Sequence, residues 1–187
     1  MSEFIEQKDG TLNKMYLVIF VYIIVGLVVL GFVLTQSNQN ENSVNEIGTK
    51  IGKKAPDFTV QTIRGDYIEL ANLQGEIVIL DFMATWCPPC RREILHLKEV
   101  YSNKSYENLR IISIDIDASE SIDELTTFKE AYKINWILAR GPSLGEKYKI
   151  SSIPTIYILN EHGNIYYKNV GVTSASEILE KLKGIRG

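Results

Sequence analysis

The chain has 187 residues, of which 45% are hydrophobic, and its formal net charge is −3. This length suits one domain with short additional segments, and the mild negative charge gives no reason to expect a nucleic-acid partner. Only two cysteines are present, Cys87 and Cys90, which excludes a disulfide-rich scaffold.

The first long apolar run extends from Met15 to Leu34 and contains no charged residue. About 20 apolar residues are enough for a helix to cross a bilayer. A buried core helix would show an amphipathic period, which this run lacks. A cleaved signal peptide would have a shorter apolar region and a small-residue cleavage site, and Thr35-Gln-Ser-Asn-Gln39 offers none. We therefore expect residues 15–34 to form an uncleaved transmembrane helix, a signal anchor.

Positive charge flanks this run on one side only. Lys8 and Lys14 precede it, whereas no Lys or Arg occurs from Thr35 to Thr49. The positive-inside rule then predicts a short cytoplasmic N-terminus at residues 1–14 and an extracytoplasmic C-terminal domain held to the cell membrane by a single pass. Residues 35–49 are polar and predict a flexible linker, which leaves residues 50–187 for the folded domain.

From residue 50 onward, short β-type runs alternate with amphipathic helical segments. Strands are expected at residues 58–63, 67–70, 77–82, 109–116, 136–139, 155–159 and 165–170. The first two strands should form a hairpin around Arg64-Gly65-Asp66, and the last two a hairpin around Asn160-Glu-His-Gly-Asn164. Ser121, Ser143 and Ser174, each with a glutamate three residues later, should begin helices, and Gly184 should end the last one. This order predicts an α/β fold with a central mixed sheet covered on both faces.

The segment Trp86-Cys-Pro-Pro-Cys90 lies where the strand at 77–82 leads into a helix. Pro88 is near the first helical position, where its missing N–H is not needed. Free N–H groups and the positive end of the helix dipole favour a thiolate at that place. Cys87 is therefore the expected nucleophile in disulfide exchange. Cys90, one turn further along, is placed to resolve the mixed disulfide.

Two structural roles for the cysteine pair fit the sequence less well. A disulfide across two residues closes a very short loop and would constrain the unfolded chain little. A zinc site usually has four ligands, and neither His96 nor His162 has metal-ligand spacing to the cysteines. Paired cysteines beside a β–α unit are typical of a redox centre. We expect no metal and no cofactor.

Residues 51–183 resemble the thioredoxin fold and, more narrowly, the membrane-anchored TlpA-type extracytoplasmic thiol–disulfide oxidoreductases. The matching segments are Ile51-Gly-Lys-Lys-Ala-Pro-Asp-Phe58, Asp81-Phe-Met-Ala-Thr-Trp-Cys-Pro-Pro-Cys-Arg-Arg-Glu93, Ile153-Pro154-Thr155 and an inserted helix around Ser121 to Lys133. The resemblance implies a thioredoxin fold, in which helices flank a central mixed β-sheet, with an N-terminal β-hairpin extension and one preceding transmembrane helix. It also implies reduction of protein disulfides, with cytochrome c maturation among the tasks that such proteins serve.

The resemblance assigns Cys87 to the exposed nucleophile of the family and Cys90 to its buried resolving thiol. Pro154 matches the family's cis-proline, which faces the cysteines across the fold. The backbone of Ile153 would then be free to pair with a bound substrate, beside Trp86.

Two acids also match family positions. Asp81 matches the buried acid beneath the cysteine pair of thioredoxin, and burial should raise its pKa so that it can exchange protons with Cys90. A salt-bridged structural acid is the alternative there. Glu93 matches a glutamate near the active site of TlpA-type proteins, and a solvated surface position stays equally open for it. The proline that often follows this glutamate is replaced by Ile94 and Leu95.

The predicted function is that of an enzyme, a membrane-tethered protein-disulfide reductase that acts outside the cytoplasm. It would cycle the Cys87–Cys90 pair on disulfide-containing protein substrates and be re-reduced by a membrane thiol electron donor. We expect a monomer. An oxidase of DsbA type would use the same pair in reverse. A peroxiredoxin-like peroxide reductase would require a threonine-rich turn before its cysteine. A metallochaperone would require a histidine beside the pair.

Overall fold

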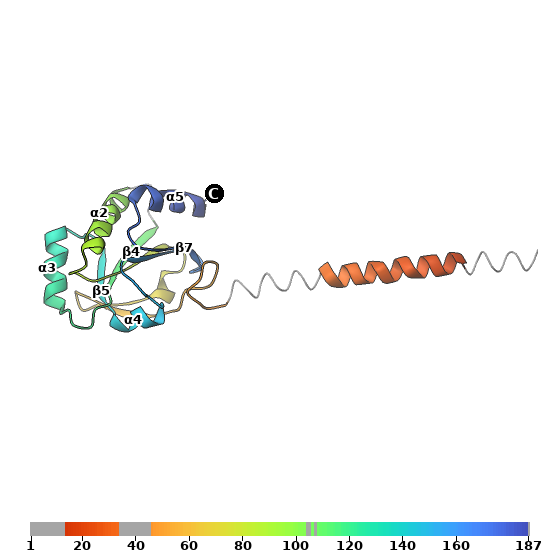
Figure 1. Cartoon of the computed structure of the whole chain (residues 1–187), viewed down its shortest axis with the longest axis horizontal. Coiled ribbons are helices and arrows are strands. Elements are labelled where there is room, and N and C mark those ends of the chain that lie inside the picture. The colour runs from red at the N-terminus through yellow and green to blue at the C-terminus, as the bar shows by residue number, and fades with distance from the viewer. Residues whose placement is uncertain (1–13, 34–45, 104–105, 107, 187) are drawn as a thin grey trace, which may run out of the picture. The chain divides into compact units, whose positions relative to one another are not determined.

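The structure is a computed structural model that describes residues 14–33, 46–103, 106 and 108–186. One part is the helix Lys14–Val33 (Figure 1). With 20 residues, this helix is long and apolar enough to cross a membrane. This helix coincides with the expected span at 15–34 to within one residue at each end. Of the predicted N-terminal segment 1–14 and linker 35–49, only Lys14 and residues 46–49 lie within the described residues.

The folded domain is built on one seven-stranded mixed sheet in the order β2-β1-β5-β4-β3-β6-β7. The strands are β1 (Thr59–Thr62), β2 (Tyr67–Glu69), β3 (Ile77–Met83), β4 (Leu109–Asp115), β5 (Ile137–Arg140), β6 (Thr155–Leu159) and β7 (Ile165–Val170). In the middle, β3 pairs in parallel with β4 and antiparallel with β6. The expected hairpins β1–β2 and β6–β7 are both present, and Gly65 turns the first at φ 93°. The predicted fold class is confirmed.

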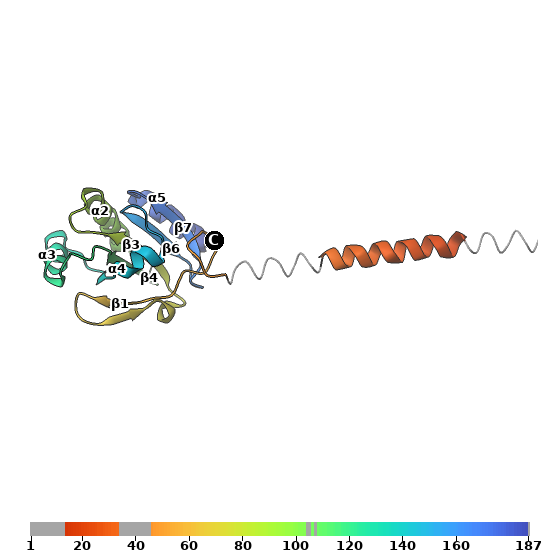
Figure 2. The same ribbon diagram turned by 60° about the horizontal axis from the view of Figure 1, so that its bottom comes forward.

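Helices cover both faces of this sheet (Figures 1 and 2). They are the 3₁₀ helix η1 (Leu70–Leu73) and the α-helices α2 (Pro88–Ser102), α3 (Ile122–Tyr132), α4 (Pro142–Lys147) and α5 (Ala175–Arg186). Residues of α2, α3 and α5 pack in one apolar core, and residues of η1 and α4 pack in another on the opposite face.

The alternation of side chains along β3 decides what faces α2. Ile79 and Met83 belong to the core beneath α2, whereas Leu80 and Phe82 belong to the opposite core. Because side chains two residues apart in a strand share a face, Asp81 points to the same side as Ile79 and Met83. The strand thus carries a carboxylate into the core beneath the cysteine helix.

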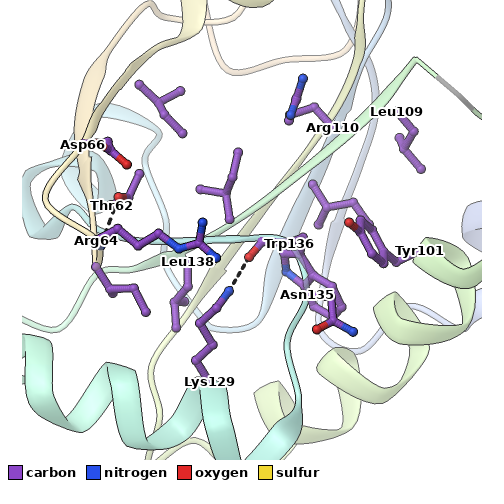
Figure 3. A pocket seen from close by; sticks show the side chains of 14 residues that line it. Thr62, Arg64, Asp66, Tyr101, Leu109, Arg110, Lys129, Asn135, Trp136 and Leu138 are labelled. Carbon is purple, nitrogen blue, oxygen red and sulfur yellow. Dashed lines mark hydrogen bonds between the residues drawn. The ribbon is translucent and has the colours of Figure 1, made fainter.

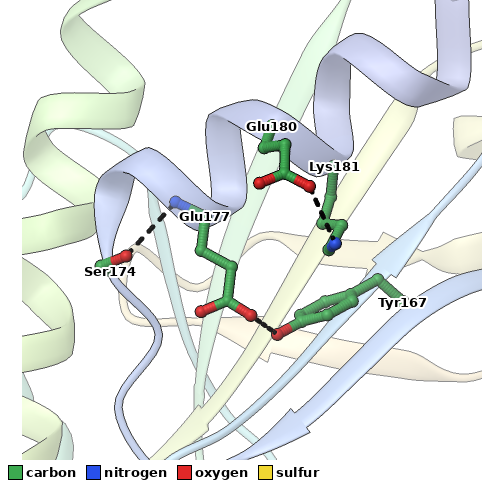
Figure 4. Close-up of polar contacts among 5 residues, drawn as sticks. All are labelled: Tyr167, Ser174, Glu177, Glu180 and Lys181. Atoms are coloured by element: carbon green, nitrogen blue, oxygen red, sulfur yellow. Dashed lines mark hydrogen bonds and ion pairs between the residues drawn. The ribbon is translucent and has the colours of Figure 1, made fainter.

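Two of the three serine caps are confirmed. Ser121 forms a full capping box with Glu124 at the start of α3. The hydroxyl of Ser174 accepts a hydrogen bond from the backbone N–H of Glu177 (3.3 Å) at the start of α5, and Figure 4 shows this cap. The Glu177 carboxylate in turn accepts a hydrogen bond from the hydroxyl of Tyr167 on β7 (2.7 Å), which ties the helix to the sheet.

Two predicted helix boundaries are wrong. Ser143 does not cap α4, because Pro142 already occupies the first helical position and Gly141 precedes it. Gly184 does not end α5, which continues to Arg186. A Cβ atom at Gly184 would lie 2.5 Å from the hydroxyl oxygen of Tyr166, so this glycine permits a close approach between helix and sheet.

Candidate active site

The cysteine pair lies where β3 ends and α2 begins. Cys87 is the N-cap of α2, and Pro88 occupies the first helical position, as predicted. Cys87 and Cys90 form a disulfide with their Cα atoms 5.3 Å apart. The backbone N–H of Cys90 points at Cys87 Sγ over 3.2 Å. In the reduced protein the same N–H and the helix dipole would stabilise a thiolate at Cys87.

Both cysteines are buried in this oxidised form. Cys87 is 3% exposed and Cys90 is fully inaccessible, so the expectation of an exposed Cys87 is wrong here. The loop before β6 lies against the pair, with the carbonyl oxygen of Ile153 3.8 Å from Cys87 Sγ. The Ile153–Pro154 peptide bond is cis, as the resemblance implies. The structure therefore brings the loop of Ile153 and Pro154 directly against the disulfide.

Trp86 stands beside the pair with 58% of its surface exposed. Its indole N–H donates a hydrogen bond to Asp117 Oδ2 (2.7 Å), on the loop that follows β4. Trp86 and Ile153 both line a hollow of about 360 Å³, together with residues 116–118 and 150–152. Of the three residues expected to bind substrate, Trp86, Ile153 and Pro154, the first two thus line one concave surface, and the backbone of Ile153 lies against Cys87.

Asp81 is fully buried, and its partner is a hydroxyl group rather than a cation. It faces Ser113 in the β3–β4 ladder, and Ser113 Oγ donates a hydrogen bond to Asp81 Oδ2 (2.7 Å). The other oxygen, Oδ1, has no hydrogen-bond partner among the described residues. Burial, only partly offset by the Ser113 hydroxyl, raises the pKa of Asp81 to about 7. The alternative of a salt-bridged acid does not fit these contacts.

Glu93 is fully buried as well, so the alternative of a solvated surface acid is wrong. The backbone N–H of Thr173 donates to Glu93 Oε2 (2.7 Å), and Oε1 has no partner among the described residues. Burial, followed by the charge of Asp81, raises the pKa of Glu93 to about 8. Glu93 lies three residues beyond Cys90, on the same side of α2. Burial is thus the main cause of both raised pKa values, and the charge of Asp81 adds to the shift of Glu93.

A hydrogen-bond chain that the sequence analysis missed extends from Asp81 to Trp136. The indole N–H of Trp136 donates to Ser113 Oγ (3.0 Å), which donates to Asp81. The signal in the sequence is the alternation Ile111-Ile-Ser-Ile-Asp115, which places polar residues on one face of an otherwise apolar strand. This chain fixes the orientation of the Asp81 carboxyl.

Asp115, at the end of β4, and Glu120, in the loop that follows, were also missed, and both are buried. The backbone N–H of Thr85 donates to both oxygens of the Glu120 carboxylate (2.9 and 3.2 Å), and the Thr85 hydroxyl donates to the same group. Burial raises the pKa of Asp115 to about 7; the backbone N–H of Asp117 opposes this shift, and the Glu120 carboxyl adds to it. Glu120 thus anchors the residue that immediately precedes Trp86.

Comparison with known proteins gives consistent results. The AhpC/TSA family model matches residues 51–168. Thioredoxin-like protein YneN of Bacillus subtilis (strain 168) is 32% identical over 143 residues, which are 75% of this chain and 83% of the relative. Thiol-disulfide oxidoreductase ResA of Bacillus thuringiensis subsp. konkukian (strain 97-27) is 29% identical over 173 residues, 91% of this chain and 95% of the relative. A solved thiol:disulfide interchange protein of the thioredoxin family from Chlorobium tepidum TLS superposes with a TM-score of 0.64 at 26% identity, covering 72% of this chain and 96% of that chain.

Proposed function

Because the chain belongs to the AhpC/TSA family and is a thiol–disulfide oxidoreductase, we propose that it reduces disulfides in extracytoplasmic proteins through a Cys87–Cys90 cycle. The observation that carries this proposal is the disulfide at the start of α2, with Asp81 and Glu93 buried on the same side of the sheet. Cytochrome c maturation, which the resemblance to TlpA-type proteins implies, is one task that this activity would serve.

The proposed cycle begins with the Cys87 thiolate attacking a substrate disulfide. A Cys87–substrate disulfide forms, and one substrate sulfur leaves as a thiolate. The Cys90 thiolate then attacks Cys87 Sγ, closes the Cys87–Cys90 disulfide and releases the second substrate sulfur. The substrate gains two electrons and the pair loses two, which leaves the oxidised form seen in the structure.

Cys90 must lose its proton before it can attack, and it is fully buried. Asp81 and Glu93 are the acids in its surroundings, and their raised pKa values of about 7 and about 8 allow either group to gain or lose a proton near neutral pH. We assign proton transfer from Cys90 to this pair of carboxyls. The Trp136–Ser113 chain would hold Asp81 in place for it.

The Lys14–Val33 helix would tether the enzyme to the membrane, with the domain outside the cytoplasm. That compartment is oxidising, so the pair needs a dedicated reductant after each turnover. A membrane thiol electron donor would supply two electrons and return Cys87 and Cys90 to the dithiol form.

Trapping of mixed disulfides tests the assignment. In membranes that contain the full chain, Cys90→Ser should accumulate covalent complexes with substrate proteins, because Cys87 attacks and nothing releases it. Cys87→Ser, the matched control, should accumulate none. Equal trapping by the two variants would contradict the roles. The reduction potential of the wild-type pair decides the direction, since about −270 mV is typical of a reductant and about −120 mV of an oxidase.

A further inference from the structure

A pocket between the sheet and the helices α2 and α3 is lined by neither cysteine (Figure 3). Its volume is about 330 Å³, which is within the size range of small-molecule sites. Apolar side chains from the strands, among them Ile68, Ile111 and Leu138, line it. The rings of Tyr101 and Trp136, with centroids 5.6 Å apart, form one wall. Neither cysteine and none of Trp86, Ile153 and Pro154 lines this pocket.

The pocket exists because the β1–β2 hairpin separates early from β5. In the ladder between β1 and β5, Gln61 pairs with Arg140 and Thr62 pairs with Ala139, and no other residues pair. One further backbone hydrogen bond follows, from the N–H of Ile63 to the carbonyl oxygen of Leu138 (3.0 Å), and the chain then turns back. Ile137, at the beginning of β5, therefore has no partner from β1 within the described ladders. Residues of the turn line the resulting opening.

Positive charge predominates around this opening. Arg64, Arg110 and Lys129 line it, against Asp66 as the single acid of the lining. Glu76 neutralises Arg110 through two hydrogen bonds of 2.8 and 2.9 Å. Arg64 and Lys129 form no ion pair with a carboxylate in the part of the chain that the structure describes.

Arg64 and Lys129 approach the same space from opposite sides. Figure 3 shows the guanidinium of Arg64, from the hairpin turn, reaching toward the amine of Lys129, from α3. Lys129 Nζ donates one hydrogen bond, to the backbone carbonyl of Trp136 (2.6 Å). Burial, followed by the charge of Arg64, lowers the pKa of Lys129. Two cations that repel each other above an apolar surface form a site that an anion would stabilise.

We propose that this pocket binds a small organic carboxylate with an apolar body. The carboxylate lies between Arg64 and Lys129, since a guanidinium group pairs with a planar carboxylate through two parallel hydrogen bonds. The apolar body contacts Leu138 and the ring of Tyr101, which removes apolar surface from water. This binding requires no disulfide chemistry.

Trp136 supplies a direct readout, because it forms a wall of the pocket and its indole N–H is hydrogen-bonded to Ser113. The chain contains two tryptophans, so the Trp86→Phe variant leaves the indole N–H signal of Trp136 alone in a proton–nitrogen NMR correlation spectrum. The full chain in detergent is titrated with 2-naphthoate and, in parallel, with the uncharged 2-naphthamide.

We expect a saturable shift of the Trp136 signal with 2-naphthoate and a much weaker one with 2-naphthamide. Arg64→Gln and Lys129→Gln should each raise the dissociation constant about tenfold, or about 1.4 kcal/mol. Arg92→Gln is the matched control, since this exposed arginine on α2 does not line the pocket. Equal binding of acid and amide, unchanged affinity in both charge variants, or no saturable shift would each overturn the proposal. Disulfide reduction by Arg64→Gln without ligand should equal that of the wild type, which keeps this test separate from the reductase assignment.

Discussion

Asp81 and Glu93 are two buried acids that the packing of an apolar core does not explain. Asp81 receives one hydroxyl hydrogen bond, and Glu93 receives one from a backbone N–H. Each keeps a carboxylate oxygen without a partner among the described residues. Ionising such groups in a buried region is unfavourable, which is why both pKa values are raised. Residues with these properties destabilise the folded chain at neutral pH and are suited to proton transfer.

Replacing Asp81 by Asn should stabilise the oxidised protein at pH 8. The folded pKa of about 7 exceeds the unfolded value of about 3.9. The folded wild type therefore holds more protons than the unfolded chain between these values, and its stability falls as pH rises from about 4 to about 7. Asp81→Asn has no titrating carboxyl at this position, so its stability does not fall in this way. We expect it to be about 2–4 kcal/mol more stable at pH 8, on the basis of about 1.4 kcal/mol per unit of pKa, and nearly equal to the wild type at pH 4.

Urea unfolding of the detergent-solubilised chain, followed by near-ultraviolet circular dichroism at several pH values, measures this difference. Asp66→Asn changes an exposed aspartate and should show no comparable pH dependence. In single-turnover reduction at pH 7, Asp81→Asn should also release substrate more slowly. Lower stability at pH 8 together with unchanged release would indicate a structural role for Asp81 and leave proton transfer to Glu93.

At the scale of elements, the start of α4 shows how closely a helix can approach the sheet. A Cβ atom at Gly141 would lie 3.0 Å from Val60 Cγ2, 3.1 Å from Ile114 Cγ2 and 3.1 Å from Leu144 Cδ1. These neighbours belong to one well-packed core. We expect Gly141→Ala to destabilise the domain by about 1–3 kcal/mol through overpacking, as measured by the same unfolding experiment.

Gly184 in α5 provides the contrast. The atom nearest to an added Cβ there is the hydroxyl of Tyr166, at the end of a side chain that is 38% exposed and has room to move. In a Tyr166→Phe background that contact disappears, and Gly184→Ala should stabilise the helix by about 0.5–1 kcal/mol. A Gly141→Ala variant as stable as the wild type would contradict the close packing at α4.

The loop between β4 and α3 positions residues at the candidate active site. Asp117 holds the Trp86 ring, and Glu120 holds the backbone of Thr85, so two residues directly before Cys87 are fixed by one loop. Arg140 on β5 secures this loop in turn through the carbonyl oxygen of Glu120 (2.7 Å). The position of Cys87 therefore depends on the sheet as well as on α2.

For the whole molecule, we predict that everything after the Lys14–Val33 helix lies outside the cytoplasm, as the lysine asymmetry indicates. A reporter that is active only outside the cytoplasm should be active when fused after Lys50, and a cytoplasm-only reporter should be inactive there. Fusion of the same reporters before residue 14 is the control and should give the opposite pattern. Cytoplasmic activity after Lys50 would place the domain on the other side.

The sequence alone was sufficient for features that depend on near neighbours in the chain. The two hairpins, the caps at Ser121 and Ser174 and the position of Cys87 at the start of a helix all follow from turn residues, helix caps and side-chain alternation over a few positions. The errors at Ser143 and Gly184 have different physical reasons. At Ser143 the neighbouring Pro142 starts the helix one residue earlier, which is a local effect. At Gly184 the helix continues in close contact with Tyr166 of the sheet, and the local pattern does not include that packing.

Only the tertiary structure decided what surrounds the buried acids. The contact of Ser113 with Asp81 joins residues 32 positions apart, and that of Thr173 with Glu93 joins residues 80 apart. A periodic pattern shows that a residue faces inward, but the identity of its neighbour depends on strand order and on which loop covers the helix. Three features therefore form only when the sheet is assembled, because the segments that make each of them are far apart in the sequence. They are the burial of Glu93, the hydrogen-bond chain from Asp81 to Trp136 and the opening beside β5.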